Sequence, residues 1–517
     1  MATLRAVSSG LVYLIGAGPG DPGLITVRGV EALGRCDVVL YDALASPHLL
    51  DHVTPGAEVR FVGKRGGADS ESQESITAQL VELALSGKIV GRLKGGDPLL
   101  FARGAEEALA LAEAGVAFEI IPGVTSPVAA AAYAGIPLTH RDLASSVLFL
   151  TGTPRDGVGP DGHDWRRLAT RAGTLCVLMG MHRLRDIAAS LIAHGRPAST
   201  PTAVVQWGTR PDQRTVEAPL EHIADAVEQA GVGSPAVVII GQVVALRKQL
   251  RWFDRKPLFG QRILVTRARE QAPALARRLL AAGAAPLTLS TIELHPPPDQ
   301  ARLDRAAREV GRYDWLALTS TNGVARFFES LDRQGLDARV LGGVRVAAIG
   351  PGTAQALRER GVRADLVPDE YRGEALAAAL LAASPRPPRV LLPRAAVARD
   401  VFPDTIRAAG GEVDVVPAYV ALPPGPEARE RLRAWLAEGA IDIITLTASS
   451  TVTHLLDLLG DEAPALLAPL TLASIGPITT ATAERAGLTV AVTASTYTLD
   501  GLVDALERHL VERRAGG

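Results

Sequence analysis

The sequence contains little cysteine, no long apolar run and no excess of positive charge. Its 517 residues include two cysteines, Cys36 and Cys176, which are too few for a disulfide framework and suit a reducing compartment, so we expect a cytoplasmic protein. No apolar run reaches the roughly 18–20 residues that cross a bilayer without Gly, Pro or charge, so no membrane partner is expected. The net charge of −2 provides no basic field for nucleic acid. An acidic ligand would therefore be bound by local clusters of basic residues.

Motifs of several enzyme classes are also missing. There is no P-loop, no G-x-S-x-G elbow and no C-x-x-C pair. His48 and His52 lie one helical turn apart, but no third ligand type is near, so no metal site is expected. The apolar N-terminal stretch is short and leads into a glycine turn, which predicts a first strand rather than a signal peptide. A content of 47% apolar and 21% charged residues is typical of a globular protein of several domains.

Two glycine-rich turns, GAGPGDPG (16–23) and RLKGGDP (92–98), each follow an apolar run. Two such turns at strand ends predict a ligand crevice. The first turn resembles a dinucleotide fingerprint, but Asp21 stands at the third glycine position and Pro19 removes an N–H donor. A carboxylate where a phosphate would bind argues against NAD or FAD. An ordinary strand–helix turn is the alternative.

The second half of the chain contains an internal repeat. It begins after RWFDRKPLFG (251–260), a segment that we expect to pack on one domain and link to the next. Three segments recur at offsets of 127, 128 and 126 residues. Each is an apolar run followed by a polar turn and a helical pattern, which predicts a duplicated α/β unit with parallel sheets. The pairs are ILVTRA (263–268) with VLLPRA (390–395), YDWLALTSTNGV (313–324) with IDIITLTASSTV (441–452), and VRVAAIGPGTAQAL (344–357) with LTLASIGPITTATA (470–483).

Two proline clusters, at 295–300 and 422–428, are predicted to carry the chain between two lobes. One lobe would hold about 262–294 plus 423–517 and the other about 300–420, with a hinged cleft. Ligands bind at the carboxyl ends of strands, so four polar tips would surround one opening. Their hydroxyls and N–H groups suit carboxylates, although Ser and Thr there can also be helix N-caps. The tips are 319–322, 350–353, 447–450 and 476–480.

Over about residues 11–253 the sequence resembles uroporphyrinogen-III C-methyltransferases of the tetrapyrrole methylase class. The resemblance implies a two-lobed module that uses S-adenosylmethionine to methylate uroporphyrinogen III twice, giving precorrin-2. This cofactor has no phosphate, which explains Pro19 and Asp21 in the first turn. The motifs are GAGPGDPGLIT (16–26), YDALAS (41–46), VGKRGG (62–67), RLKGGDP (92–98), IPGVTS (121–126), AGIPLTHRD (134–142), TLCVLMGM (174–181) and SPAVVIIGQVVAL (234–246).

The same resemblance implies the roles of particular residues. Asp42 matches the proposed proton acceptor of the family and Lys64 its proton donor. A turn aspartate and a carboxylate-binding lysine are the alternatives. Basic residues implied for the eight carboxylates of the tetrapyrrole are Arg65, Lys94, Arg103 and Arg141. The residues implied for the S-adenosylmethionine pocket are Pro19, Gly95, Gly96, Asp97, Leu100, Thr125, Ser126, Met179 and Gly208, and Asp97 would also balance the positive charge of the cofactor.

Over about residues 260–510 the second half resembles uroporphyrinogen-III synthase. The resemblance rests on the duplication, on the IGP-x-T turns at 349–353 and 475–479, on PAYV (417–420) and on YTLDGL (497–502). It implies that hydroxymethylbilane is closed with inversion of its last pyrrole. Tyr419 matches a tyrosine thought to assist loss of water, with a plain strand-end tyrosine as the alternative. The implied substrate-binding residues are Thr353 and Thr479, with Ser320 and Ser449 from the other two tips.

We therefore predict a bifunctional enzyme of tetrapyrrole biosynthesis. Its domains would be 1–250 and 262–517, joined by a linker at 251–261, and its partners would be small tetrapyrroles and a second copy of the chain bound through the first half. The alternative is that only the methyltransferase is active and that the second half is a non-catalytic binding or scaffold module. The sequence leaves open whether the product feeds sirohaem or cobalamin.

Overall fold

The computed structural model describes residues 10–63, 72–153, 163–268 and 271–516, so the predicted Lys64 and Arg65 lie outside the described residues. The chain divides into two compact units. One comprises Met1–Gln261 with Leu279–Ala285 and Glu507–Gly517, and the other Arg262–Arg278 with Pro286–Leu506. None of the helices in the described ranges is long and apolar enough to cross a membrane.

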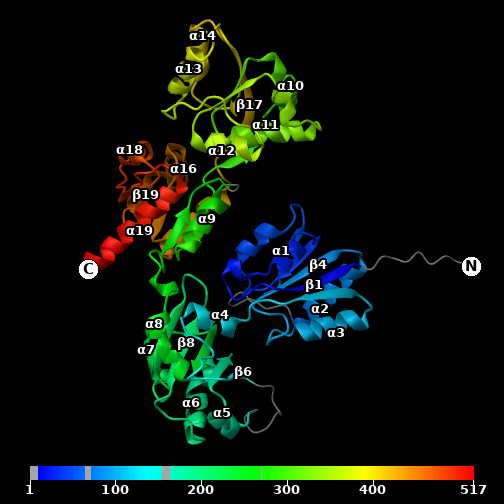
Figure 1. Ribbon diagram of the computed structural model, residues 1–517, viewed down its shortest axis with the longest axis vertical. Coiled ribbons are helices and arrows are strands. Elements are labelled where there is room, and N and C mark those ends of the chain that lie inside the picture. The colour runs from blue at the N-terminus through cyan, green and yellow to red at the C-terminus, as the bar shows by residue number, and fades with distance from the viewer. Residues whose placement is uncertain (1–9, 64–71, 154–162, 269–270, 517) are drawn as a thin grey trace, which may run out of the picture. The chain divides into compact units, whose positions relative to one another are not determined.

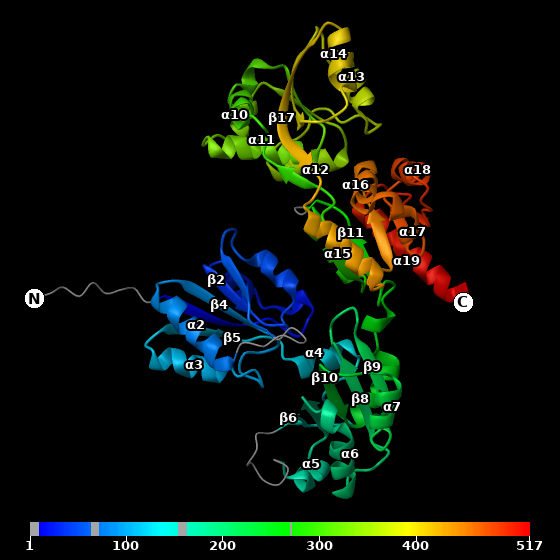
Figure 2. The same ribbon diagram turned by 180° about the vertical axis from the view of Figure 1, so that it is seen from behind.

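The first sheet is parallel and is buried on both faces. Its strand order is β3-β2-β4-β1-β5. Val12 and Leu14 pack against α2 and α3, whereas Tyr13 and Ile15 pack against α1 and η2. This explains why the strand reads as a continuous apolar run. Figures 1 and 2 show α2 and α3 on one face of this sheet and α1 on the other. The elements are β1 (Leu11–Gly16), η1 (Pro22–Leu24), α1 (Val27–Leu33), β2 (Val38–Tyr41), η2 (Pro47–His52), β3 (Glu58–Phe61), α2 (Gln73–Leu85), β4 (Ile89–Lys94), α3 (Gly104–Glu113) and β5 (Ala117–Ile121).

The second sheet of the first unit is mixed, in the order β6-β7-β10-β8-β9. Strand β6 is parallel to β7, whereas β10 is antiparallel to β7 and β8, and β9 is antiparallel to β8. The first unit is therefore two-lobed, with one parallel and one mixed sheet. The elements are α4 (Ser126–Tyr133), β6 (Val147–Thr151), α5 (Trp165–Arg171), β7 (Thr174–Leu178), η3 (Met181–Arg183), α6 (Leu184–Ala193), β8 (Pro201–Gln206), β9 (Arg214–Pro219), α7 (Ile223–Gln229), β10 (Ala236–Ile240), η4 (Gln242–Leu246), α8 (Arg247–Leu250) and η5 (Phe253–Arg255).

The segment 251–260 packs on the first unit through aromatic side chains. The ring of Tyr133, at the end of α4, contacts the rings of Trp252 and Phe253. The indole N–H of Trp252 donates to the carbonyl of Ala132 at 3.0 Å. The buried Arg247 guanidinium donates to Asp254 at 2.7 Å. These contacts hold the segment on α4 before the chain enters β11.

The second unit contains two further five-stranded sheets, in the orders β12-β11-β18-β19-β20 and β13-β17-β16-β14-β15. Strands 11, 18, 19 and 20 pair in parallel, as do strands 15, 14, 16 and 17. The strands are β11 (Arg262–Val265), β12 (Ala285–Thr288), β13 (Glu293–His295), β14 (Trp315–Leu318), β15 (Arg345–Ala348), β16 (Arg389–Ala395), β17 (Glu412–Leu422), β18 (Ile443–Leu446), β19 (Thr471–Ser474) and β20 (Val492–Thr493).

Helices connect the strands of both sheets and pack against them. They are α9 (Ala272–Ala281), α10 (Gln300–Arg308), η6 (Val310–Arg312), α11 (Thr321–Arg333), η7 (Ala338–Leu341), α12 (Pro351–Glu359), α13 (Gly373–Ala382), α14 (Val401–Ala408), α15 (Pro426–Ala437), α16 (Ser449–Leu459), η8 (Gly460–Glu462), α17 (Ala463–Leu467), α18 (Pro477–Arg485) and α19 (Leu499–Gly516).

The predicted duplication is confirmed by the position of each repeated segment in its sheet. The repeat partners β11 and β16, β18 and β14, and β19 and β15 lie in the same order in the two sheets. The match extends to single residues. Asp442, before β18, accepts from the backbone N–H of Arg262, and its repeat partner Asp314 accepts in the same way from Arg389, both at 2.8 Å. The two lobes are thus copies of one α/β unit.

The two chain crossings between these sheets are hydrogen-bonded to each other. Strand β13 pairs antiparallel with the end of β17, so that Glu293 faces Leu422 and His295 faces Val420. The proline clusters follow directly after these paired residues. A proline lacks the N–H that a ladder needs, which explains why the pairing ends there.

Candidate active sites of the two units

The two glycine turns of the first unit lie side by side. Strands β1 and β4 are parallel neighbours, so their carboxyl ends reach the same edge of the sheet. Beyond that edge, the N–H of Gly96 donates to the carbonyl of Gly18 at 2.8 Å and the N–H of Gly18 donates to the carbonyl of Gly96 at 3.2 Å. The turns that the sequence paired by pattern are therefore one structure, which we call the glycine junction (16–21 and 95–98).

A third turn, at 122–125 after β5, completes the glycine junction. A Cβ on Gly123 would lie 2.2 Å from the carbonyl oxygen of Gly96, and a Cβ on Gly16 would lie 2.4 Å from the Cα of Gly123. Only glycine allows this approach of backbones. Asp97 holds the contact, because its carboxylate accepts from the N–H groups of Gly123 at 3.1 Å and Leu99 at 2.9 Å.

The carboxylate of Asp21 binds other parts of the unit. It accepts from the hydroxyl of Tyr133 at 2.7 Å and from the N–H of Gly23 at 2.8 Å. Its own N–H donates to the hydroxyl of Thr209 at 2.9 Å. Burial, together with the Asp21 carboxylate, raises the pKa of Tyr133, so this phenol stays a donor at neutral pH. Asp21 therefore fastens the first turn to α4 and to the turn at 207–209.

One predicted cofactor residue, Met179, and both neighbours of another, Gly208, lie on strained backbone. Met179 (φ 54°), Trp207 (φ 49°) and Thr209 (φ 74°) have positive φ, although none is glycine. Such conformations cost about 1–3 kcal/mol each and cluster at functional sites. Gly208 lies between the last two, and a Cβ there would be 2.5 Å from the Cβ of Ala130. The predicted pocket residues Pro19, Gly95, Leu100, Thr125, Ser126 and Gly208 are partly exposed, Met179 is exposed, and Gly96 is buried.

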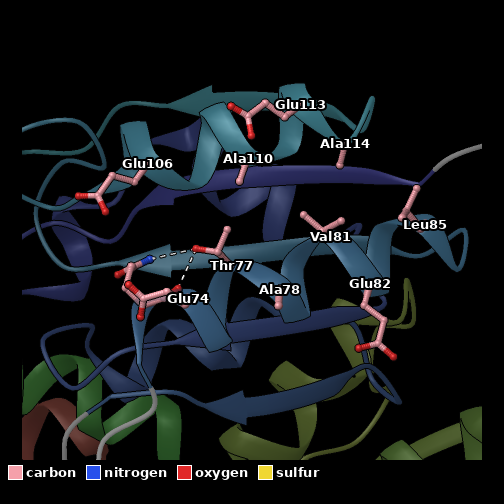
Figure 3. A pocket seen from close by; sticks show the side chains of 11 residues that line it. Glu74, Thr77, Ala78, Val81, Glu82, Leu85, Glu106, Ala110, Glu113 and Ala114 are labelled. Carbon is pink, nitrogen blue, oxygen red and sulfur yellow. Dashed lines mark hydrogen bonds between the residues drawn. The ribbon is translucent and has the colours of Figure 1, made fainter.

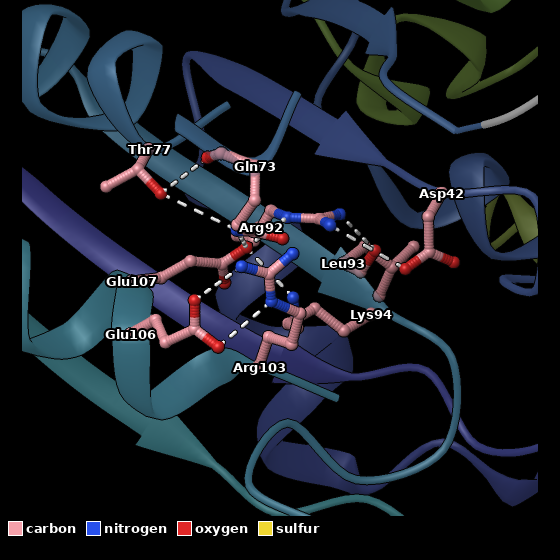
Figure 4. A network of polar contacts seen from close by, with 9 residues as sticks. All are labelled: Asp42, Gln73, Thr77, Arg92, Leu93, Lys94, Arg103, Glu106 and Glu107. Atoms are coloured by element: carbon pink, nitrogen blue, oxygen red, sulfur yellow. Dashed lines mark hydrogen bonds and ion pairs between the residues drawn. The ribbon is translucent and has the colours of Figure 1, made fainter. Parts of the chain in front are cut away.

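A buried charge network lies behind the glycine junction (Figure 4). The fully buried carboxylate of Glu107, on α3, accepts from the Lys94 ammonium at 2.9 Å and from the Arg92 guanidinium at 3.2 Å. The amide of Gln73 also donates to it, at 2.9 Å. Burial and the neighbouring Arg92 charge lower the pKa of Lys94, although Glu107 acts in the opposite direction. Lys94 is bound inside the protein, so its predicted contact with the substrate stays a prediction.

Asp42 lies at the open end of this network. It follows β2, and its Oδ2 is 3.7 Å from an Nη atom of Arg92. Its Oδ1 accepts from the N–H of Leu44 at 3.1 Å, which fixes the direction of the carboxylate. The side chain retains 25% of its exposure. A carboxylate that is held but open to solvent can exchange a proton with a ligand. The predicted partner Lys64 lies outside the described residues.

The predicted carboxylate-binding arginines are exposed. Arg103 caps the start of α3 in a left-handed conformation (φ 59°), and it forms a forked pair with Glu106 at 2.6 and 2.9 Å. Arg141 is exposed in the loop after α4. Both can reach an anion in solvent. Arg65 lies outside the described residues.

The sequence analysis missed Glu107 and Gln73. A signal for Glu107 was present, because Glu107 and Leu111 are four residues apart and lie on the buried face of α3. An acidic residue at a core position of a helix indicates a buried partner. Gln73, the first residue of α2, shows no comparable pattern.

The groove between α2 and α3 is a different feature of the first unit (Figure 3). Its walls carry Glu74, Glu82, Glu106 and Glu113, and none of the predicted cofactor residues. Four carboxylates would repel an anionic tetrapyrrole. The groove is therefore not the candidate site. Groups of three or more metal-ligating side chains do not occur in the described ranges.

In the second unit, Ser320 and Tyr419 lie together at the ends of β14 and β17. Their hydroxyl oxygens are 3.2 Å apart. Ser320 is the N-cap of α11 and accepts from the N–H of Gly323 at 2.9 Å, so the N-cap interpretation holds for this residue. Tyr419 is 7% exposed. The structure therefore brings together two of the predicted site residues from separate segments.

The other predicted residues lie in the first turns of α12 and α18, which follow the IGP turns, and of α16, which follows β18. Thr353, the third residue of α12, and its repeat partner Thr479 in α18 are each 5% exposed. The N-caps of these helices are Gly350 and Gly476, so neither threonine is an N-cap. Ser449 opens α16, and its hydroxyl accepts from Thr482 of α18 at 2.9 Å.

These observations define a chain of two fused α/β modules, each with polar or glycine-rich turns at the carboxyl ends of parallel strands. Residues 11–224 match the family of Tetrapyrrole (Corrin/Porphyrin) Methylases, and residues 273–504 match Uroporphyrinogen-III synthase HemD. The chain therefore belongs to the family of tetrapyrrole methylases fused to a uroporphyrinogen-III synthase domain. These domains make it a bifunctional protein of tetrapyrrole biosynthesis, as the sequence resemblance predicted.

Two related sequences support this assignment, and one solved structure is similar to part of the chain. The chain is 38% identical over 497 residues to the porphyrin biosynthesis protein HemD of Ruminiclostridium josui, covering 96% of this chain and 97% of that protein. It is 40% identical over 335 residues to the uroporphyrinogen-III C-methyltransferase of Bacillus subtilis, covering 65% and 68%. A crystal structure of uroporphyrin-III C-methyl transferase from Thermus thermophilus, complexed with S-adenyl homocysteine, is 41% identical and covers 46% of this chain and 100% of that one, with a TM-score of 0.39.

Proposed function

We propose that the first half transfers methyl groups from S-adenosylmethionine to uroporphyrinogen III, twice, to give precorrin-2. The glycine junction carries this proposal. Three turns approach closely enough for backbone groups and small side chains to line a pocket, and the only acids in these turns, Asp21 and Asp97, are bound to the protein. None of the residues that form the three turns is basic. This composition fits an adenosine with a sulfonium better than a dinucleotide.

S-adenosylmethionine supplies an electrophilic methyl group when it is bound. The residues of the first half then have three tasks. The glycine junction orients the cofactor, as does the strained turn at 207–209. The methylated pyrrole carbon bears a side chain and has no hydrogen of its own, so Asp42 accepts the proton that the macrocycle loses at another position once the methyl group has been added. Arg92 stabilises the ionised carboxylate of Asp42 across 3.7 Å. Lys64 is the proposed proton donor.

The macrocycle would be held by its carboxylates. We assign Arg65, Arg103 and Arg141 to this contact, since guanidinium groups bind carboxylates in a fork. The buried Lys94 would attract these carboxylates through its positive charge. The exposed Arg103 already forms a forked pair with Glu106, so a substrate carboxylate can replace that partner without reorienting the side chain.

For the second half we propose closure of hydroxymethylbilane to uroporphyrinogen III with inversion of the last pyrrole. Tyr419 would donate a proton to the departing hydroxyl, with Ser320 at 3.2 Å as the next member of the chain of hydroxyls. Thr353, Ser449 and Thr479 would bind substrate carboxylates at the helix starts. The main requirement is to hold the chain in one closing geometry. A non-catalytic binding module is the competing interpretation.

We also propose the boundaries of the two domains and the way in which two chains associate. The methyltransferase would extend to about residue 250, the linker over 251–261 and the synthase from 262 onward. Two copies would associate through the first half. The product would be handed to sirohaem or cobalamin formation.

One assay tests both activities in the intact chain. Hydroxymethylbilane is supplied with S-adenosylmethionine, and the products are separated by isomer type and by number of added methyl groups. The expected product is dimethylated and of type III. Type I uroporphyrinogen alone would contradict the synthase, whereas unmethylated type III would contradict the methyltransferase. Supplying uroporphyrinogen III directly tests the first half by itself.

A further inference from the structure

Two arginines stand at equivalent positions of the internal repeat. Arg267 follows β11 in ILVTRA, and Arg394 lies near the end of β16 in VLLPRA, 127 residues later. Both follow the carboxyl-terminal part of a central strand, where ligands of parallel sheets bind. In each, the Nε atom is buried and has no hydrogen-bond acceptor among the described residues. The two copies differ in what neutralises the charge.

Arg394 is neutralised within its own lobe. Its guanidinium pairs with the carboxylate of Asp400 and donates to the carbonyl of Arg399 at 2.9 Å. Asp400 lies six residues after the arginine. In the first copy, the residue six positions after Arg267 is Pro273, which has no charge. The duplication has therefore kept the arginine in both copies and the carboxylate six positions after it in one.

Arg267 has no carboxylate partner among the residues that the structure describes. One Nη donates to the amide oxygen of Gln271 at 2.9 Å, and that acceptor is neutral. Burial lowers the pKa of Arg267 from its ordinary value. A partly buried cation without an anion is unfavourable for stability. The side chain is still partly exposed, so a ligand can reach it.

The position of Arg267 links it to the proposed synthase site. The Gln271 amide that holds the guanidinium donates to the side chains of Thr321 at 3.1 Å and Asn322 at 2.9 Å. These residues directly follow Ser320, whose hydroxyl is 3.2 Å from that of Tyr419. The guanidinium is therefore joined, through Gln271, to the two residues that follow Ser320 in the chain.

We propose that Arg267 binds a carboxylate of the linear tetrapyrrole substrate, which thereby acts as the anion that Asp400 supplies in the other copy. This inference rests on the proposed synthase activity. A carboxylate held at Arg267 would fix one side chain of the linear substrate relative to Tyr419, and so help to select one closing geometry. Gln271 is the positioning residue that directs the guanidinium.

The test uses the full chain with hydroxymethylbilane as substrate. Arg267→Met is expected to raise the KM for hydroxymethylbilane about 10- to 100-fold, as for loss of a charge-assisted hydrogen bond, and to increase the share of type I product. Arg267→Lys keeps the charge and should recover part of this loss. Arg277→Met removes an exposed arginine from α9 and serves as the matched control, with KM unchanged.

The thermal stability of Arg267→Met distinguishes a binding role of Arg267 from a role in folding. Arg267→Met removes a charge that has no carboxylate partner in the described ranges, so its thermal midpoint should equal or exceed that of the wild type, and methylation of supplied uroporphyrinogen III should be unchanged. An unchanged KM in Arg267→Met, with type III product still formed, would overturn the inference while leaving the synthase proposal intact. A lower midpoint with loss of turnover would assign Arg267 a structural role and overturn it equally. Absence of type III product from the wild type would instead contradict the synthase proposal.

Discussion

Most charged residues around the glycine junction form hydrogen bonds or ion pairs with other parts of the protein. Asp21 accepts a hydrogen bond from the hydroxyl of Tyr133, and Asp97 accepts one from the N–H of Gly123. The ammonium of Lys94 donates to Glu107. Each contact joins segments that are far apart in sequence. Asp42 differs, because its carboxylate accepts from the N–H of Leu44, only two residues away, and otherwise lies 3.7 Å from Arg92. This makes Asp42 the acid of the group that is best placed for proton transfer.

Asp42→Asn should therefore slow methylation of supplied uroporphyrinogen III by about 10²- to 10⁴-fold, the usual range for a general base. Binding of S-adenosylmethionine, measured by calorimetry, should be retained because Asp42 is not in the glycine junction. Asp51→Asn, an exposed aspartate in η2, is the control. A normal rate in Asp42→Asn would remove it from the proton-transfer role.

Glu107→Gln should destabilise the first unit by about 3–5 kcal/mol, because it leaves the buried Lys94 and Arg92 without their shared carboxylate. The midpoint of unfolding by urea or heat measures this. Glu113→Gln, on the exposed end of the same helix, should change stability by less than about 0.5 kcal/mol. Equal midpoints for the two variants would mean that the network contributes little to folding.

At the scale of elements, the duplicated strands are fastened in the same way in both lobes. Asp442 joins the start of β18 to the start of β11, and Asp314 joins β14 to β16. In each pair a carboxylate accepts the first N–H of the neighbouring strand, which fixes the register of a parallel pair. The site residues at the other ends of these strands are placed by that register.

The Asp442 contact predicts a dependence on pH. Burial raises the pKa of Asp442, but the hydrogen bonds from Arg262 outweigh burial and hold the pKa below its usual value. Its contribution to stability is therefore complete above the unfolded pKa, near 3.9, and is lost as the pH falls through the lower folded value. Asp442→Asn should lower the unfolding midpoint at pH 7, and the difference from wild type should shrink below about pH 4. A difference that stayed constant down to pH 3 would contradict this.

At the scale of the whole molecule, two modules with separate folds and separate candidate sites occupy one chain. The described ranges assign the glycine junction to the first unit and the Ser320–Tyr419 pair to the second. A reaction that makes uroporphyrinogen III and a reaction that methylates it are consecutive in chemistry. The proposed activities therefore form one sequence in which each half can be tested alone.

Tyr419→Phe tests this independence. The variant should slow formation of type III product from hydroxymethylbilane, because the hydroxyl beside Ser320 is lost. It should leave methylation of supplied uroporphyrinogen III unchanged, since the first unit contains no part of that site. Both rates are measured on one preparation. Equal loss of both activities would show that the substitution damages the fold rather than the ring closure.

Elements that depend on local chemistry and pattern could be predicted from the order of residues. Apolar runs followed by glycine turns predicted β1 and β4, and near-constant offsets predicted the two copies in the second unit, because strands and repeats leave a signal in the order of residues. The motif resemblance also predicted Asp42 and Tyr419 as site residues; their roles stay predictions.

Which groups meet could be seen only in the folded chain. The contacts of Gly18 with Gly96, of Asp97 with Gly123, of Lys94 with Glu107 and of Gln271 with Asn322 join residues from different parts of the chain. Whether a charge is paired depends on distance in space, and the same lysine or arginine in a motif can bind a ligand or a buried carboxylate. The physical reason is that desolvation and pairing act on the folded neighbourhood, which the order of residues does not display.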